Sequence, residues 1–330
     1  MSGAKFGIAA FHRVPAPDLV RMARLTEGLG FDSFWLSDSH MLFREVYVTL
    51  GAVAQVTQRI EIGPGVTYPA ARHPSVTASA TATLAELAPG RVNLGLGIGS
   101  SGPRNIGQRP VGLHTLEDAI QLIRDLLAFK EVERNGKRMQ LTFATGAPVP
   151  IYVAAASDRT HRMTGRAADG AIMGGAIDGI AAAIAAIREG ERAAARPSGS
   201  VKTLQMVACC LDEDEELARR SVRGVVARMA MVWLDRADRL GTIDPRDREA
   251  LDRLRQSYDF YRHLSVEHAH LVEERWIDRF AVTGAPARIL RRCEEIFAAG
   301  ADQILLHFQG ADLERQMERF AGEVMAGRRD

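Results

Sequence analysis

The chain has 330 residues, of which 46% are hydrophobic and 25% are charged, close to the averages of globular proteins. Its 42 Lys and Arg residues nearly balance its 41 Asp and Glu residues. This balance argues against the broad basic surface that non-specific nucleic-acid binding requires, and no apolar stretch approaches membrane-spanning length. We therefore expect a small-molecule partner rather than a nucleic acid or a membrane.

Three cysteines occur, and Cys209 and Cys210 are adjacent within an apolar run. Neighbours in a strand point to opposite faces, so we expect buried thiols rather than a disulfide. There is no CxxC pair and no Cys/His cluster at metal-ligand spacing, so neither a disulfide framework nor a metal site is expected. Too few residues precede the apolar segment at residues 6–11 for a signal peptide, which favours the cytoplasm.

Eight short strand-like runs alternate with helical patterns. The runs cover residues 5–10, 33–36, 59–66, 92–98, 151–154, 170–173, 202–211 and 303–308. Between them, apolar residues step by three or four, as at Leu116, Ala119 and Ile123. Strands joined by helices run parallel, and eight such units close most economically into an α/β fold, the (β/α)₈ TIM barrel. An open doubly wound sheet is the second architecture that this pattern allows.

Two segments interrupt the alternation. Residues 132–145 contain Asn135 and Gly136 between strand-like flanks, which predicts a small hairpin before strand five. Residues 226–279, after strand seven, are too long for one crossover helix and predict extra helices. They form either a lid or substrate-selecting wall, or an oligomer contact. We expect one domain over residues 1–330 with these two insertions.

The loop after the second strand carries Asp38, Ser39 and His40. Barrel enzymes keep reactive groups at the carboxyl ends of their strands, and an acid, a hydroxyl and an imidazole suit proton transfer there. Helix capping by Asp38 or Ser39 is the alternative.

Glycines gather after the third and fourth strands, at residues 63–65 and 95–102. Two glycines around a proline suit a bulge that brings backbone close to a flat ligand, although an ordinary turn has the same composition. We expect the alternating glycines after strand four, Gly97 and Gly99 among them, to make room for a planar ring system.

Small residues lead into the helices that follow strands five and six, namely Ser157 and the pair Gly174 and Gly175. The start of a helix exposes N–H groups and the positive end of its dipole, which suits a phosphate. Simple capping is the alternative. Two such loops on adjacent units favour a cofactor phosphate.

An ordered series of motifs spans nearly the whole chain. The motifs are DSH at 38–40, REVY at 44–47, GPGVT at 63–67, RHP at 72–74, TASA at 77–80, TL at 83–84, GR at 90–91, DRF at 278–280 and TGAP at 283–286. This series resembles the luciferase-like flavin and deazaflavin barrel superfamily, in the coenzyme F420-dependent branch that includes methylenetetrahydromethanopterin reductase.

The resemblance implies a deazaflavin across the barrel mouth, with its ring on a bulge that contains a non-proline cis peptide at Gly65–Val66. Such a coenzyme passes a hydride to or from a carbonyl, imine or alkene carbon, and the protein supplies position and a proton. The cofactor-binding residues expected from the resemblance and from the loops above are Asp38, Ser39, Gly65, Val66, Thr67, Gly97, Gly99, Ser157, Gly174 and Gly175.

Two departures from related reductases concern the proton donor. Strand one offers Ala9 and Ala10 where relatives place a glutamate, and residues 100–104 lack the acid that is common there. We therefore expect His40 to be the catalytic proton carrier, with Asp38 beside it, because imidazole exchanges protons near neutral pH. His12 is the second candidate. Alternatively, His40 only stacks on the cofactor and His12 is a solvated loop residue.

Three functions compete. The first is an F420-dependent oxidoreductase acting on a small or medium organic substrate, which Asp38, Ser39 and Arg44 favour. The second is an FMN-dependent luciferase-like monooxygenase. The third is a cofactor-free binding or structural protein, against which the glycine-rich loops count. Apolar outer helices and the resemblance favour a homodimer or a larger even assembly.

Overall fold

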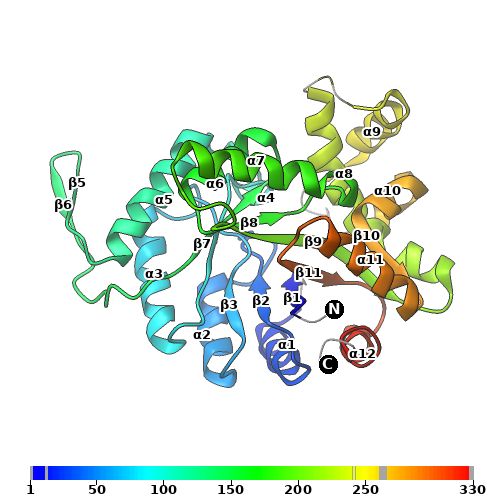
Figure 1. Ribbon diagram of the computed structural model, residues 1–330, viewed down its shortest axis with the longest axis horizontal. Coiled ribbons are helices and arrows are strands. Elements are labelled where there is room, and N and C mark those ends of the chain that lie inside the picture. Colours follow the sequence, from blue (N-terminus) through cyan, green and yellow to red (C-terminus); the bar gives the residue numbers. More distant parts are fainter. Residues whose placement is uncertain (1–2, 12–13, 240, 242, 260–265, 327–330) are drawn as a thin grey trace. The chain divides into compact units, whose positions relative to one another are not determined.

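The computed structural model of the chain describes residues 3–11, 14–239, 241, 243–259 and 266–326 (Figure 1). Contacts between residues divide the chain into two compact units. Unit 1 comprises residues 1–8, 173–184 and 203–330, and unit 2 comprises residues 9–172 and 185–202. We describe each unit by itself.

The strands of unit 2 are parallel and almost wholly buried. They are β2 (Ser33–Leu36), β3 (Glu61–Pro64), β4 (Leu94–Leu96), β7 (Ile151–Ala155) and the first three residues of β8 (Gly170–Met173). β2 pairs with β3, and β4 pairs with β7. Two single bridges, from Ile62 to Val92 and from Thr67 to Leu96, connect the chain around β3 with the chain around β4.

The helices of unit 2 follow the strands in turn. They are α1 (Ala16–Gly28), α2 (Val46–Val56), α3 (Pro74–Leu87), α4 (Ser101–Asn105), α5 (Leu113–Leu127), α6 (Asp158–Ala167) and the second half of α7 (Ile180–Ala193). α3 begins at Pro74, where a missing N–H costs nothing, and the side chain of His73 accepts a hydrogen bond from Ser75 N. α5 buries the predicted stripe of Leu116, Ala119 and Ile123.

An antiparallel hairpin follows α5. Its strands are β5 (Val132–Arg134) and β6 (Lys137–Met139), and Figure 1 shows it projecting away from the helices of unit 2. Asn135 and Gly136 form its turn with φ angles of 50° and 69°. Positive φ at both central residues is what a tight hairpin turn requires, so the predicted hairpin is confirmed.

The sheet of unit 1 contains the first four residues of β1 (Lys5–Ala10), all but the first residue of β9 (Lys202–Leu211), β10 (Ala281–Gly284) and β11 (Gln303–Phe308). β11 pairs in parallel with both β1 and β9, and β10 pairs with β9. The sequence did not predict β10. Its four residues are too few to show an alternating pattern, and the pairing with β9 makes them a strand.

The helices of unit 1 include the predicted extra helices after β9. They are η1 (Ile177–Gly179), the first half of α7, α8 (Glu215–Arg239), α9 (Pro245–Ser257), η2 (Val266–Leu271), α10 (Glu274–Phe280), α11 (Pro286–Ala298), α12 (Leu313–Arg319) and η3 (Phe320–Val324). Part of the second insertion, residues 240, 242 and 260–265, lies outside the described residues.

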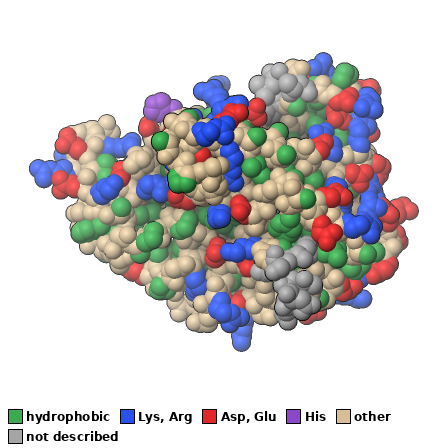
Figure 2. All heavy atoms as spheres, in the orientation of Figure 1, with side chains coloured by type: hydrophobic (Ala, Val, Ile, Leu, Met, Phe, Trp, Pro, Cys, Tyr) green, Lys and Arg blue, Asp and Glu red, His purple; other side chains and the backbone are tan. Residues whose placement is uncertain are grey.

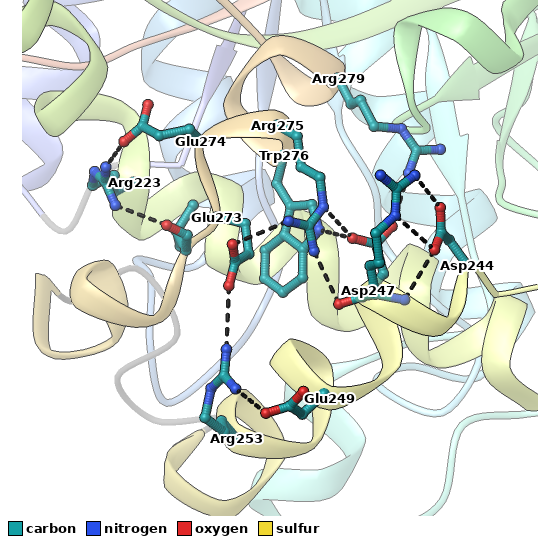
Figure 3. A network of polar contacts seen from close by, with 12 residues as sticks. Arg223, Asp244, Asp247, Glu249, Arg253, Glu273, Glu274, Arg275, Trp276 and Arg279 are labelled. Atoms are coloured by element: carbon teal, nitrogen blue, oxygen red, sulfur yellow. Dashed lines mark hydrogen bonds and ion pairs between the residues drawn. The ribbon is translucent and has the colours of Figure 1, made fainter.

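Arginine side chains tie these extra helices together (Figure 3). The buried carboxylate of Asp247 on α9 accepts hydrogen bonds of 2.7 Å from Arg275 Nε and from the indole N–H of Trp276, both on α10. Arg253 of α9 contacts Glu273, and Arg223 of α8 contacts Glu274. The Arg-rich composition of the insertion therefore serves ion pairs between helices. Its role as a lid or as an oligomer contact stays a prediction.

Eight of the parallel strands coincide with the eight predicted runs, although β3 and β4 are shorter than predicted. The order of strand and helix along the chain is that of the (β/α)₈ TIM barrel, which confirms the predicted fold class. None of the described helices is long and apolar enough to cross a bilayer.

Candidate functional site

Asp38, Ser39 and His40 follow directly after β2, whose four residues are all buried. Asp38 and Ser39 are buried and His40 is half-buried. The hydroxyl oxygens of Ser39 and Ser101, at the start of α4, are 2.8 Å apart. The structure thus brings the end of β2 and the start of α4 together at one edge of unit 2.

The carboxylate of Asp38 is held by Arg72. Arg72 Nη1 lies 2.5 Å from Asp38 Oδ2, and its other terminal nitrogen contacts Glu45. The Asp38 side chain is 2% exposed and that of Arg72 is 17% exposed. Burial alone would lower the pKa of Arg72, but the charges and hydrogen bonds of Asp38 and Glu45 outweigh it and the pKa is raised. Because the Asp38 carboxylate is paired with Arg72, Asp38 is better suited to orienting its neighbours than to donating a proton as a free acid.

The chain after β3 forms the predicted bulge. The Gly65–Val66 peptide is cis, as the resemblance implied. A Cβ atom on Gly65 would lie 2.8 Å from Trp35 Cβ. The backbone continues along β4, with Thr67 N donating to Gly95 O and Gly97 N donating to Thr67 O.

The glycines after β4 lie against this bulge. A Cβ atom on Gly97 would lie 2.9 Å from a methyl group of Val66. Gly99 has a φ of 86°, and a Cβ atom there would lie 3.1 Å from the ring of Tyr68. Gly97 and Gly99 therefore make room for side chains of the protein itself, and their contact with a cofactor stays a prediction.

Tyr68 is a site residue that the sequence reasoning missed. Its buried phenol oxygen lies 2.7 Å from His40 Nδ1, and the two rings are stacked at 6.2 Å with an angle of 24°. Burial, and then the negative charge of Asp38, raise the pKa of Tyr68 above its ordinary value. Its position in the sequence could have identified it as a site residue, because Tyr68 directly follows Thr67 in the predicted bulge.

Ser157 caps α6. Its side chain accepts a hydrogen bond from Thr160 N at 3.1 Å and lies 2.8 Å from the Thr160 hydroxyl. Helix capping by Ser157, the alternative to phosphate binding, is therefore confirmed, and a phosphate at the same helix start stays a prediction.

Gly174 and Gly175 belong to unit 1. A Cβ atom on Gly175 would lie 2.7 Å from the ring of Trp233 on α8, and one on Gly174 would lie 3.2 Å from Met206 Cε. Packing of Trp233 thus explains why a glycine stands at position 175. The phosphate contact of both glycines stays a prediction, and His12, the second candidate proton carrier, lies outside the described residues.

Comparison with known proteins identifies the family. The model of the luciferase-like monooxygenase family matches residues 4–303. A 5,10-methylenetetrahydromethanopterin reductase of Methanolobus tindarius is 28% identical over 310 residues, which cover 91% of this chain and 93% of the relative. An F420-dependent glucose-6-phosphate dehydrogenase of Kineococcus radiotolerans is 30% identical over 347 residues, 97% of this chain and 96% of the relative.

A solved structure has the same fold. The coenzyme F420-dependent tetrahydromethanopterin reductase of Methanopyrus kandleri matches with a TM-score of 0.83 at 24% identity, over 98% of this chain and 99% of its own. The family match covers most of the chain, and the resemblance seen in the motifs is thereby confirmed. The chain belongs to the luciferase-like monooxygenase family.

Proposed function

We propose that the chain is a coenzyme F420-dependent oxidoreductase that passes a hydride between the deazaflavin and a small or medium organic substrate. The observation that carries this proposal is the half-buried imidazole of His40, held beside the ion-paired Asp38 at the carboxyl end of β2. The reductase of Methanolobus tindarius and the F420-dependent dehydrogenase of Kineococcus radiotolerans support the reaction class.

The described residues fit a coenzyme in this place. The hydroxyl oxygen of Ser37, just before Asp38, is buried and makes no hydrogen bond within the described part of the chain. A buried hydroxyl without a hydrogen-bond partner destabilises the folded protein unless a ligand or a water molecule bonds to it. Ser37 and the hydroxyls of Ser39 and Thr67 supply polar contacts for a ring edge. Ser157 at the start of α6 is our proposed phosphate contact in unit 2, and Gly174 and Gly175 are our proposed phosphate contacts in unit 1.

The coenzyme, when bound, supplies the hydride chemistry. His40 exchanges the proton that accompanies hydride transfer, because it is the one imidazole at this strand end among the described residues. Arg72 keeps the Asp38 carboxylate in place, and Nη1 of Arg72 also lies 3.4 Å from the Thr67 hydroxyl. This link joins the end of β2 to the bulge on which the ring is proposed to rest.

An FMN-dependent monooxygenase is the second candidate, because the matching family is described as luciferase-like monooxygenases. The third candidate is a cofactor-free binding protein. The F420-dependent dehydrogenase of Kineococcus radiotolerans, which matches 97% of this chain, counts against it.

The test supplies the enzyme with reduced F420 and, one at a time, a ketone, a cyclic imine and an activated alkene. Reappearance of the visible absorbance of oxidised F420 reports hydride transfer. We expect at least one probe class to be reduced without oxygen. Oxygen-dependent conversion of the probes with reduced FMN, and none with reduced F420, would move the chain to the monooxygenase class.

We propose a homodimer as the assembly, supported by exposed apolar side chains on α2 and α3. Val48 is 75% exposed, Val76 52% and Leu87 44%, and Figure 2 shows hydrophobic side chains gathered over these two helices. An exposed apolar surface of this kind marks an interaction site. Light scattering on the purified protein tests the dimer, and a monomeric mass would contradict it.

We propose the cytoplasm as the compartment. The thiols of Cys209, Cys210 and Cys293 are all free and buried, which suits a reducing environment.

A further inference from the structure

We infer that Tyr68 is a positioning residue for His40, whose phenol holds Nδ1 of the imidazole so that Nε2 is the nitrogen that exchanges the proton. This inference rests on the proposed function, because it assigns an atom to the proton transfer that His40 performs there.

The distance between the two side chains supports a direct hydrogen bond. The Tyr68 oxygen and His40 Nδ1 are 2.7 Å apart, a normal length for such a hydrogen bond. It is the only side-chain hydrogen bond that either ring makes within the described part of the chain. His40 is half-buried and Tyr68 is 3% exposed, so the tyrosine is enclosed by the protein while His40 remains partly accessible.

The position of the phenol is itself fixed by two glycines. A Cβ atom on Gly102, in α4, would lie 1.8 Å from the Tyr68 oxygen. A Cβ atom on Gly99 would lie 3.1 Å from the Tyr68 ring. The backbone at Gly102 approaches the phenol more closely than any other residue would permit, and the backbone at Gly99 packs tightly against the ring. Tyr68 is therefore a rigid point against which the imidazole is oriented.

A phenol is suited to this task because its oxygen accepts a hydrogen bond while it keeps its own proton. Its oxygen accepts from the Nδ1–H of His40, and Nδ1 carries that hydrogen both in the neutral ring whose bare nitrogen is Nε2 and in the charged ring. Burial and the negative charge of Asp38 raise the pKa of Tyr68, so the phenol keeps its proton at neutral pH. The bond to Nδ1 of His40 thus persists in both charge states, and Nε2 is left to exchange the proton.

The first test reads the imidazole directly, without coenzyme or substrate. In protein labelled with ¹⁵N-histidine, two-bond proton–nitrogen spectra report both ring nitrogens, and His40→Gln assigns the His40 signals. We expect Tyr68→Phe to move the Nδ1 signal of His40 out of its hydrogen-bonded position. Tyr47→Phe is the matched control, because Tyr47 is also a tyrosine in unit 2 whose hydroxyl bonds a side chain, that of Thr81 at 3.2 Å. It should leave the His40 signals unchanged.

The second test separates positioning from folding. With a probe that the wild type reduces, Tyr68→Phe should lower kcat on the order of tenfold, the usual worth of one hydrogen bond, and leave KM and the coenzyme Kd within about twofold. Gly102→Ala, which forces the phenol to shift, should give the same split. Unchanged His40 signals or an unchanged kcat in Tyr68→Phe would overturn the inference while the proposed function stands. A wild type that binds no F420 would instead overturn the proposed function.

Discussion

The contact between Asp38 and Arg72 is the feature of the site with the largest expected effect on stability. Arg72→Met removes the partner of a carboxylate whose side chain is 2% exposed. An unpaired buried charge is strongly destabilising, so the free energy of unfolding should fall by about 3 kcal/mol. Urea denaturation at neutral pH measures this change.

The matched control is Arg21→Met, which breaks the pair between Arg21 and Asp18 on α1. Those side chains are 62% and 37% exposed, and such pairs contribute less than about 1 kcal/mol. Equal losses in the two variants would contradict the importance given to the buried pair.

His40 is the residue whose removal should affect chemistry most. His40→Ala should lower turnover on the order of 10²–10⁴-fold, the range of a positioned acid or base, and leave the coenzyme Kd within a few-fold. Single-turnover oxidation of reduced F420 measures the rate, and His114→Ala, on the exposed face of α5, is the control. A raised Kd with turnover close to that of the wild type would mean that His40 only stacks on the ring.

The places of single residues were predicted where they directly follow a predicted strand. Asp38, Ser39 and His40 lie at the end of β2 as expected, and the cis peptide is at Gly65–Val66, where the family resemblance implied it. The prediction for the glycines was incomplete, because a glycine-rich composition indicates free space beside the backbone but not which group occupies that space. Val66 and Tyr68 take that room next to Gly97 and Gly99. The bond from Tyr68 to His40 joins residues 28 positions apart, a separation that local patterns do not reveal.

At the scale of elements, the loop from α7 to β9 depends on one buried carboxylate. Glu191 accepts hydrogen bonds from Val201 N at 2.7 Å, Gly199 N at 2.9 Å and Arg188 at 2.9 Å. Burial alone would raise the pKa of Glu191, but these donors outweigh it and the pKa is lowered from 4.5. Glu191→Gln should therefore cost about 2 kcal/mol of unfolding free energy at neutral pH.

The same shift fixes the sign of the pH dependence. A group with a lowered pKa in the folded state stabilises fully above its unfolded pKa, and the effect is lost as the pH falls through the folded value. The difference between wild type and Glu191→Gln should thus shrink as the pH falls below about 4.5. Glu189→Gln, whose pair with Arg162 is exposed, is the control. A constant difference over this pH range would contradict the assignment.

Helices and strands were predicted well where apolar residues recur with a regular period. They were predicted poorly where contacts with distant parts of the chain determine the element. The hairpin at Asn135–Gly136 has a local cause in its turn and was found. β3 ends at Pro64, earlier than predicted, because Gly65 N makes the last hydrogen bond to β2, at Leu36 O, and the bulge begins there although the apolar run continues. For the Arg-rich insertion, the sequence predicted extra helices from its length alone. The partners of Asp247 could not be predicted, because they depend on how these helices pack.

At the scale of the whole molecule, we predict one domain in spite of the two compact units. The division between the units falls inside β1, between Ile8 and Ala9, and inside β8, between Ile172 and Met173. Domain boundaries ordinarily fall in exposed linkers, so a division inside strands does not mark one. Calorimetry should give a single unfolding transition whose calorimetric and van't Hoff enthalpies agree. Two resolved transitions would contradict this prediction.

The central claim is that the chain is built to use F420, and titration of the purified protein with F420 and with FMN tests it most directly. Fluorescence of each coenzyme reports binding without knowledge of the substrate. The account predicts that F420 binds more tightly than FMN, by at least about tenfold, which corresponds to 1.4 kcal/mol of binding free energy. Equal affinity for the two coenzymes, or tighter binding of FMN, would contradict it.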